Sequence, residues 1–421
     1  MNKKLIAVAV AGLLAAPLVA QAQTANVVLY GRLNLDLEYV NATAPNNPLG
    51  LPSPPYAGTA DTPNVARLSS NSSRFGLRGT ESLGGGLNAI WQIESSVSGD
   101  AGGGTIAGRD TFIGLQGSWG TVRFGNFLAP YDDLHPVFGD SGTYLTSIAA
   151  QAALWANNGG YSKGTGSFDD RLGNSLRYDS PNIAGFTGSI QVALFDDAGA
   201  GGATRSTVWS TAGQYKNGPF TGIIGFEYNN DVRCYNGVGP GGGNGTNSAC
   251  GVAATAANPR FEADDWAFGI AAAWDFGIVR VAGLYERIHY DTPQGGLKRD
   301  LYGVYFSGPV GPGKWYLGYS YADEGKGPTD AQGRPTQRVN GIAGGDDTGA
   351  YHLSISYNQP ISKRTSWYVA YSRLDNDDRA TYNFNINPYR NTTTYTTGCS
   401  TNSNPCGLEL DGFLVGMIHL F

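Results

Sequence analysis

Short stretches of alternating apolar and polar residues recur along this chain, and this period of two constrains the fold more than any other feature. In VVLYGRLNLDLEY, Leu33, Leu35 and Leu37 fall on one face, whereas Asn34 and Asp36 fall on the other. Such alternation predicts β-strands, because successive side chains of a strand point to opposite faces. GFTGSIQVALFD and PFTGIIGFEYNN repeat the pattern, with aromatic residues toward the ends of the apolar face. An apolar face of this kind suits lipid.

The first residues have the pattern of a cleaved secretion signal. Two lysines precede the run LIAVAVAGLLAAPLVA, and AQA at its end fits the small-x-small cleavage rule. A membrane anchor is the alternative, but the run has 16 residues and a spanning helix needs about 20. We expect residues 1–22 to be removed and residues 23–421 to form one domain. No later apolar run reaches spanning length, so any membrane insertion must use strands.

Short and long connections alternate between the predicted strands. The short ones are Ser82–Gly86, Ser118–Gly120, Ser180–Ala184, Asn217–Gly218, Asp275–Gly277, Gly311–Gly313 and Gln359–Lys363. The long ones are 41–66, 128–172, 231–263, 324–348 and 376–407. Seven short turns join eight hairpins, which gives about sixteen strands, and bacterial barrels have even numbers of strands. We therefore predict an all-β fold, a transmembrane up-and-down antiparallel β-barrel with short periplasmic turns and long outer loops; closure removes the exposed sheet edges.

The charge and cysteine content restrict the possible partners and cofactors. The formal net charge is -6 without basic runs, which argues against nucleic acid as a partner. Four cysteines fall into two local pairs, Cys234 with Cys250 and Cys399 with Cys406. In an exported protein such pairs indicate loop disulfides. Metal ligation is the alternative, but no histidine lies close in sequence to either pair, and we expect neither a bound metal nor a cofactor.

Strand parity separates the predicted lipid face from the lumen. An arginine on the lipid face near mid-membrane costs about 2–4 kcal/mol, so charged positions are expected to point inward. This test places five arginines inside and leaves the direction of Arg109 open, because the phase of its strand is blurred. The five are Arg32, Arg74, Arg78, Arg123 and Arg177. They predict a positive wall for ions and small anionic solutes, or else salt bridges with Asp36, Glu38, Glu94 or Asp179.

Five stretches together resemble a known family. They are VVLYGRLNLDLEYV, SSRFGLRGTESLGGGLNAIWQIES, RDTFIGLQGSWGTVRFGN, NSLRYDSPNIAGFTGSIQVALF and ISKRTSWYVAYSRLDN. These stretches resemble the Gram-negative general diffusion porins, particularly their beta-proteobacterial branch, in the same order from Asn26 to Phe421. The resemblance implies a homotrimer of sixteen-stranded, water-filled barrels in the cell outer membrane, in contact with outer-membrane lipid and lipopolysaccharide. It also implies that the third outer loop, 128–172, folds into the pore and constricts it.

The resemblance assigns roles to individual positions. Arg32 matches the basic residue after the family's L-Y-G, and Arg74 and Arg109 match wall arginines that open S-R-x-G-L-x-G and R-x-x-F-x-G-L. Two positions depart from the pattern. Val137 stands where enterobacterial relatives have a loop-tip glutamate, and Asn126 stands where arginine is common. The acidic side of the constriction then depends on three loop residues, Asp132, Asp133 and Asp140.

The function expected from these features is passive diffusion of ions and small hydrophilic solutes, with a weak anion preference. A substrate-specific channel is the nearest alternative, but it would need an aromatic track along the lumen, which we cannot trace. A barrel enzyme and an adhesin are less favoured. The four histidines, His135, His289, His352 and His419, form no recognisable Ser/His or Asp/His constellation in the sequence, so we expect no catalysis.

The last stretch, LDGFLVGMIHLF, is predicted to be the barrel-closing strand, paired with the first strand near VVLYGR. Its outward set is Phe413, Val415, Met417, His419 and Phe421. In the family, a terminal Phe with apolar residues at alternate positions resembles the signal read by the barrel-insertion machinery. A structural role at the membrane interface is the alternative. The inward Ile418 and Leu420 have no explanation from the sequence, since relatives often carry a basic residue at the penultimate position.

Overall fold

The computed structural model describes most of the chain between Asn26 and Phe421. The described residues are 26–43, 63–138, 147–155, 168–196, 205–236, 246–248, 260–331, 333, 335–339, 341–389 and 406–421. The expected signal peptide, residues 1–22, lies outside these ranges. Among the described residues, no helix is both long and apolar enough to span a membrane.

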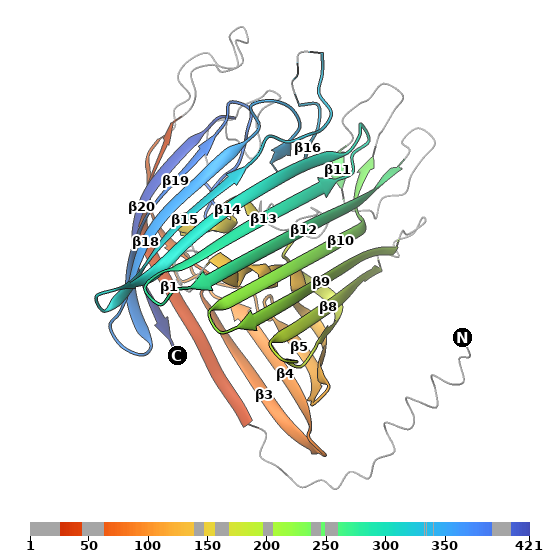
Figure 1. Cartoon of the computed structure of the whole chain (residues 1–421), viewed down its shortest axis with the longest axis vertical. Helices are drawn as coiled ribbons and strands as arrows, with labels where there is room; N and C mark the ends of the chain where they lie inside the picture. Colours follow the sequence, from red (N-terminus) through yellow and green to blue (C-terminus); the bar gives the residue numbers. More distant parts are fainter. Residues whose placement is uncertain are drawn as a thin grey trace, which may run out of the picture.

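One closed antiparallel sheet forms the wall of the molecule (Figure 1). Its strands are β1 (Asn26–Thr43), β2 (Val65–Ser70), β3 (Arg74–Gly84), β4 (Leu87–Ser96), β5 (Thr111–Gly117), β6 (Gly120–Leu128), β7 (Arg171–Asp179), β8 (Phe186–Asp196), β9 (Arg205–Asn217), β10 (Phe220–Asn236), β11 (Thr246–Ser248), β12 (Arg260–Asp275), β13 (Arg280–Tyr290), β14 (Leu297–Val310), β15 (Gly313–Ala322), β18 (Ala350–Pro360), β19 (Thr365–Asn376) and β20 (Glu409–Leu420). β2 and β3 both pair with β1 and are two segments of one wall strand, and β11 only extends an outer loop. The described segments therefore make sixteen wall strands, as predicted. A separate small hairpin consists of β16 (Arg338–Val339) and β17 (Ile342–Ala343).

The seven predicted short turns are confirmed. Each of the seven short turns joins two strands that pair with each other. In the tightest one, Gly218 has φ 55°, a left-handed conformation that glycine adopts at no steric cost. Two further connections among the described residues, which the sequence did not single out, lie at the opposite end of the barrel: 97–110 and 291–296. They are short for outer loops, and this is why their turn signals did not stand out.

The alternation of side chains is also confirmed. On β1, Leu33 and Leu37 are 41% and 57% exposed, whereas Asn34 and Asp36 are 0% and 1% exposed. On β20, Phe413, the next outward residues and Phe421 are exposed in the same way. The apolar face is thus the outer surface of the barrel and the polar face lines its interior.

The barrel closes between β1 and β20. Their register runs from Arg32 opposite Leu420 to Thr43 opposite Glu409, and Gly31 and Phe421 exchange backbone hydrogen bonds of 2.9 and 3.1 Å. The predicted pairing of the first and last strands is confirmed, although it meets the stretch VVLYGR only at Gly31 and Arg32. The rest of that stretch pairs with β3 instead.

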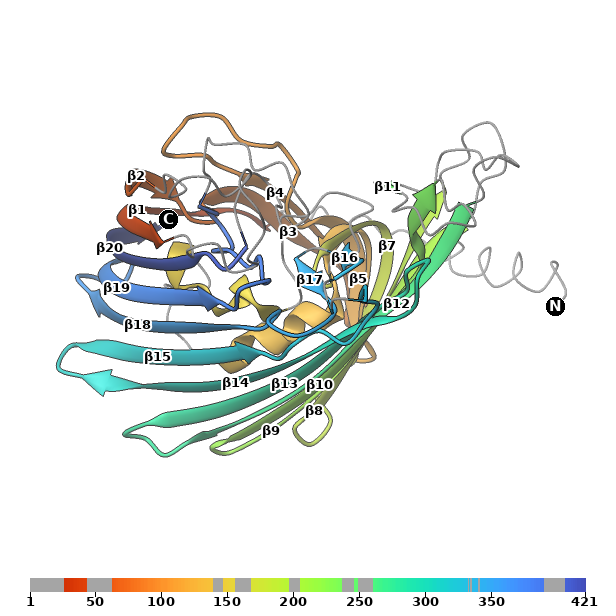
Figure 2. The same cartoon turned by 90° about the horizontal axis from the view of Figure 1, so that it is seen from above.

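The third loop lies inside the ring of strands, where Figure 2 shows its helical segments. These are η1 (Pro130–Phe138), η2 (Ser147–Ala149) and η3 (Gln151–Ala153). η1 packs against β8, β9, β10, β12 and β13, and η2 and η3 pack against β15, β18 and β19. Ile148 of η2 belongs to the same buried apolar cluster as Leu414 and Ile418 of β20. This packing explains the apolar Ile418 on the inner face of the closing strand, whereas Leu420 is 45% exposed and lies outside the cluster.

The closing seam leaves no space for a side chain at Gly31. A Cβ atom there would overlap the Phe421 ring and lie 2.8 Å from the carbonyl oxygen of Arg74. We expect Gly31→Ala to lower the free energy of unfolding by about 1–3 kcal/mol, as overpacking does elsewhere, and to lower the melting temperature followed by circular dichroism in detergent. Gly213→Ala is the matched control, because its Cβ would meet only Ile224 Cγ2 at 3.7 Å. Equal melting temperatures for the two variants would contradict this account of the seam.

Candidate functional site

Four arginines gather around one carboxylate on the inner face of the wall. Glu94 of β4 accepts a hydrogen bond from Arg109 Nε at 2.6 Å, and its other oxygen lies 3.6 Å from Arg74 Nε on β3. Arg32 of β1 is directly opposite Arg74 in the β1–β3 register. Arg78, four residues beyond Arg74, completes the set. The structure therefore brings together four of the six predicted wall arginines, including Arg109, whose direction the sequence left open.

Local backbone features hold these side chains. β2 and β3 are separated by a break at which Ser72 has φ 52°, and the carbonyl oxygens of Asn71 and Ser72 accept hydrogen bonds from Arg32 at 3.3 Å each. The Arg78 guanidinium lies 5.1 Å from the ring centroid of Tyr30, and the Tyr30 hydroxyl donates to Glu94 at 3.0 Å. The break between two strand segments is what makes carbonyl groups available to Arg32.

We call Arg32, Arg74, Arg78, Arg109, Tyr30 and Glu94 the basic cluster. It contains four guanidinium groups and one carboxylate, so the set carries an excess of positive charge. The side chains of Arg74 and Arg109 are 30% and 17% exposed, and they therefore reach the solvent inside the barrel. Unbalanced charge in a cleft with low-dielectric walls attracts ions of the opposite sign.

The other two predicted wall arginines are neutralised by ion pairs. Arg123 of β6 contacts Asp179 at 2.6 Å, and Arg177 of β7 contacts Asp179 at 2.8 Å and Asp133 at 2.7 Å. Two guanidinium groups thus face two carboxylates. For Arg123 and Arg177 the structure favours the salt-bridge interpretation, because little net charge is left to act on a solute.

Arg171, whose side chain is 24% exposed, is an arginine that the sequence analysis did not single out. Its Nε atom lies 2.8 Å from Asp110 Oδ1, and Asp110 directly follows Arg109 in the chain. Parity could not have found it, because β7 is irregular here: Asn174 has φ 52°, and the β6–β7 register shifts between Gly125 and Phe127.

The predicted loop acids have different surroundings. Asp133 bonds Arg177, as described above, and Asp132 Oδ1 lies 2.6 Å from His135 Nδ1 on the same helical segment. Asp140 lies outside the described residues. Val137, which replaces the glutamate of enterobacterial relatives, is buried, and its carbonyl oxygen accepts a hydrogen bond from Arg280 at 2.8 Å. In this chain, the side chain at that position therefore packs against the wall.

A buried polar network anchors the loop to the wall. Arg299 of β14 donates to the Leu154 carbonyl oxygen and to Glu286 of β13, both at 2.5 Å. The Tyr131 hydroxyl of η1 donates to the other Glu286 oxygen at 3.0 Å. Burial, together with the nearby Glu286 carboxylate, raises the pKa of Tyr131 well above its usual value, so the hydroxyl stays protonated and acts as a donor. The Arg299–Glu286 pair thus binds two described segments of the loop, one through Tyr131 and the other through Leu154.

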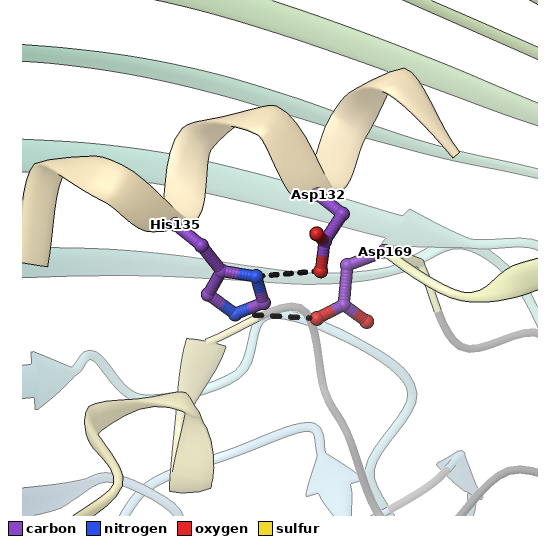
Figure 3. Close-up of side chains that lie close together, drawn as sticks. All are labelled: Asp132, His135 and Asp169. Atoms are coloured by element: carbon purple, nitrogen blue, oxygen red, sulfur yellow. Dashed lines mark hydrogen bonds and ion pairs between the residues drawn. The ribbon is translucent and has the colours of Figure 1, made fainter. Parts of the chain in front are cut away.

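The structure also assembles a group of three side chains that the sequence did not suggest. Asp132 and His135 of η1 meet Asp169 (Figure 3), which precedes β7 at the other end of the loop. His135 Nε2 lies 3.7 Å from Asp169 Oδ2. Burial raises the pKa of Asp169 well above its usual value, and the neighbouring Asp132 and Asp170 raise it further. The only sequence signal was the spacing of three residues between Asp132 and His135.

The cysteine prediction is tested only in part. Cys406 is buried and disulfide-bonded. Cys250 and Cys399 lie outside the described residues, and Cys234 is part of β10. The two local pairings therefore remain predictions.

The closed sixteen-stranded barrel with a loop folded inside it defines a membrane-spanning β-barrel protein of the bacterial outer membrane. The chain belongs to the Gram-negative porin family, whose sequence model matches residues 7–379. It is 33% identical over 264 residues to the major outer membrane protein P.IA of Neisseria meningitidis serogroup A, a match that covers 54% of this chain and 62% of that protein. It is 28% identical over 389 residues to outer membrane porin protein 32 of Delftia acidovorans, covering 90% of this chain and 92% of the relative.

Solved structures share the fold. The anion-selective porin from Comamonas acidovorans aligns with a TM-score of 0.65 at 23% sequence identity, covering 94% of this chain and 100% of that one. The trimer form of OmpT from Vibrio cholerae aligns with a TM-score of 0.60 at 15% identity, covering 95% and 100% of the two chains.

Proposed function

We propose that the chain forms a water-filled channel for the passive diffusion of ions and small hydrophilic solutes, with a weak preference for anions. The basic cluster carries this proposal, because four guanidinium groups and one carboxylate share the inner face of the barrel. Positive side chains in a narrow pore favour anions over cations. The name of the Comamonas acidovorans structure, an anion-selective porin, supports the same preference.

The third loop, 128–172, is proposed to form the constriction. Its described helical segments already lie inside the barrel and pack against two groups of wall strands, β8 to β13 and β15 to β19. Asp132 and Asp133 have basic neighbours, His135 and Arg177, so they offset the basic cluster only weakly. Asp140 remains a proposed third acid of the loop.

The assembly and its partners extend the same proposal. We expect a homotrimer, because a related fold, OmpT of Vibrio cholerae, has been solved in a trimer form. The exposed apolar band would contact outer-membrane lipid and lipopolysaccharide. The outward residues of β20, from Phe413 to Phe421, are exposed and would be read by the barrel-insertion machinery. Residues 1–22 would be removed as a secretion signal before insertion.

The alternatives find less support. An aromatic track would indicate a substrate-specific channel, but the aromatics of the loop region, Tyr131, Trp155 and Phe168, are buried against one another. A hydrolase would need an accessible nucleophile. His352 does lie 2.7 Å from Ser372 Oγ, yet both side chains are fully buried, so a substrate would not reach them.

Planar bilayers test the proposal directly. Purified protein should insert as an open pore, and under a KCl gradient its reversal potential should have the sign of anion permeation. The field of the basic cluster gives this sign, and the potential should shrink at high salt, because the Debye length falls from about 10 Å at 0.1 M to about 3 Å at 1 M. A cation-favouring potential would exclude the preference, and the absence of conductance would exclude the channel.

A further inference from the structure

The two ends of the third loop meet at Asp132, His135 and Asp169. One candidate ligand atom from each side chain lies within 4.8 Å of the others. Two ligands of one zinc ion can be at most about 4.2 Å apart, because each lies about 2.1 Å from the metal. A small adjustment of one carboxylate therefore brings all three side chains into range of a common ion. Figure 3 shows both carboxylates on the same side of the imidazole ring, each joined to one of its nitrogen atoms.

The burial of the Asp169 carboxylate is a second, independent observation that points to a bound cation. Its side chain is 2% exposed, and neither of its oxygens has a hydrogen-bond partner among the described residues. Buried carboxylates are normally hydrogen-bonded, paired with a charge or bound to a metal. The contact with His135 Nε2, at 3.7 Å, is longer than a hydrogen bond. At 3.7 Å, His135 Nε2 and Asp169 Oδ2 are close enough to share one ion that lies about 2.1 Å from each.

The surroundings favour a cation. Glu227 and Glu286 of the adjacent wall strands lie close enough to Asp169 to act on it electrostatically, and Glu227 is fully buried. Asp132 Oδ1 lies 2.6 Å from His135 Nδ1, so Asp132 is the carboxylate that turns from this nitrogen toward the ion. Asp132 and His135 are 19% and 14% exposed, which leaves a path from the lumen.

We propose that Asp132, His135 and Asp169 bind one divalent transition-metal cation of the Zn²⁺ class, which joins the two ends of the third loop. One imidazole and two carboxylates suit Zn²⁺, whereas Ca²⁺ and Mg²⁺ select oxygen ligands only. Water completes the coordination on the exposed side. The sequence predicted no metal site because Asp169 is remote from the other two residues along the chain.

The test is a calorimetric titration of ZnCl₂ into the full-length folded protein in detergent, after treatment with a chelator. We expect one site per chain and binding at least 10-fold weaker in His135→Gln and in Asp169→Asn. His289→Gln is the matched control, because His289 also faces a carboxylate, Asp291 at 3.3 Å, but belongs to no three-residue group among the described residues. No binding by the wild type, or equal binding by His135→Gln, would overturn the proposal.

Melting temperatures with and without ZnCl₂ give a second measurement. ZnCl₂ should raise the melting temperature of the wild type and of His289→Gln but leave that of Asp169→Asn unchanged, because a ligand stabilises only the state that binds it. Without metal, Asp169→Asn should melt no lower than the wild type, since the amide removes an unpaired buried charge, so the variant remains informative. Stabilisation by CaCl₂ or MgCl₂ equal to that by ZnCl₂ would overturn the assigned class of metal.

Discussion

Replacing Arg32, Arg74 and Arg109 together by glutamine is expected to move the reversal potential of the channel from anion-favouring to neutral or cation-favouring. The change removes three of the four cations of the basic cluster and leaves one cation, Arg78, with one carboxylate, Glu94. A unit charge at 4 Å in water contributes about 1 kcal/mol, and screening reduces this within a Debye length of about 10 Å at 0.1 M salt. The anion-to-cation permeability ratio should therefore fall roughly 5- to 10-fold. Glutamine keeps a donor for the carbonyl groups that now bind Arg32.

The matched control removes three arginines elsewhere. Arg287 and Arg373 lie between buried residues of their strands and pair with Asp300 and Asp375, and Arg364 lies in a short turn. The triple variant Arg287→Gln, Arg364→Gln and Arg373→Gln changes the net charge by the same amount without touching the basic cluster. Its reversal potential should stay within error of the wild type. A shift equal to that of the first variant would mean that total charge, and not the cluster, sets the selectivity.

The sequence predicted the barrel because each strand carries its own local signal. The alternation of Leu33 and Asn34 on β1 needs no knowledge of other strands, and the short turns are local as well. The same rule fails where a strand is irregular. Leu172 and Leu176 have the same parity, yet Leu172 is buried and Leu176 is 41% exposed, because the left-handed Asn174 between them shifts the phase of β7.

For the candidate site, the sequence predicted only which arginine side chains point into the barrel. Strand parity placed both Arg32 and Arg123 on the inner face, but it could not show which of the two has a carboxylate beside it. Arg123 is neutralised by Asp179, which comes from the neighbouring strand in the barrel. The contacts of the loop, such as Leu154 with Arg299, depend on how a long segment folds back on the wall, and no local pattern encodes that.

The buried pair of Arg299 and Glu286 leads to the second large effect. Both side chains are 0% exposed, and Glu286 would be left without its cation in Arg299→Ala. Removing one partner of a buried ion pair typically costs about 3–5 kcal/mol, so we expect a large fall in melting temperature. Arg287→Ala is the control between the same two strands. Its pair with Asp300 at 2.6 Å joins an arginine that is 45% exposed to a carboxylate that is 9% exposed, so we expect a smaller fall in melting temperature than in Arg299→Ala, in which both partners are fully buried.

A double variant separates stability from anchoring of the loop. Arg299→Met with Glu286→Leu replaces the ion pair by apolar groups, a change that is often neutral for stability. It nevertheless removes the donors to the Leu154 carbonyl and the acceptor for the Tyr131 hydroxyl. We therefore expect near-normal melting but frequent closures in single-channel recordings, because the third loop is no longer tied to β13 and β14. Quiet wild-type-like currents from this variant would show that apolar packing alone holds the loop.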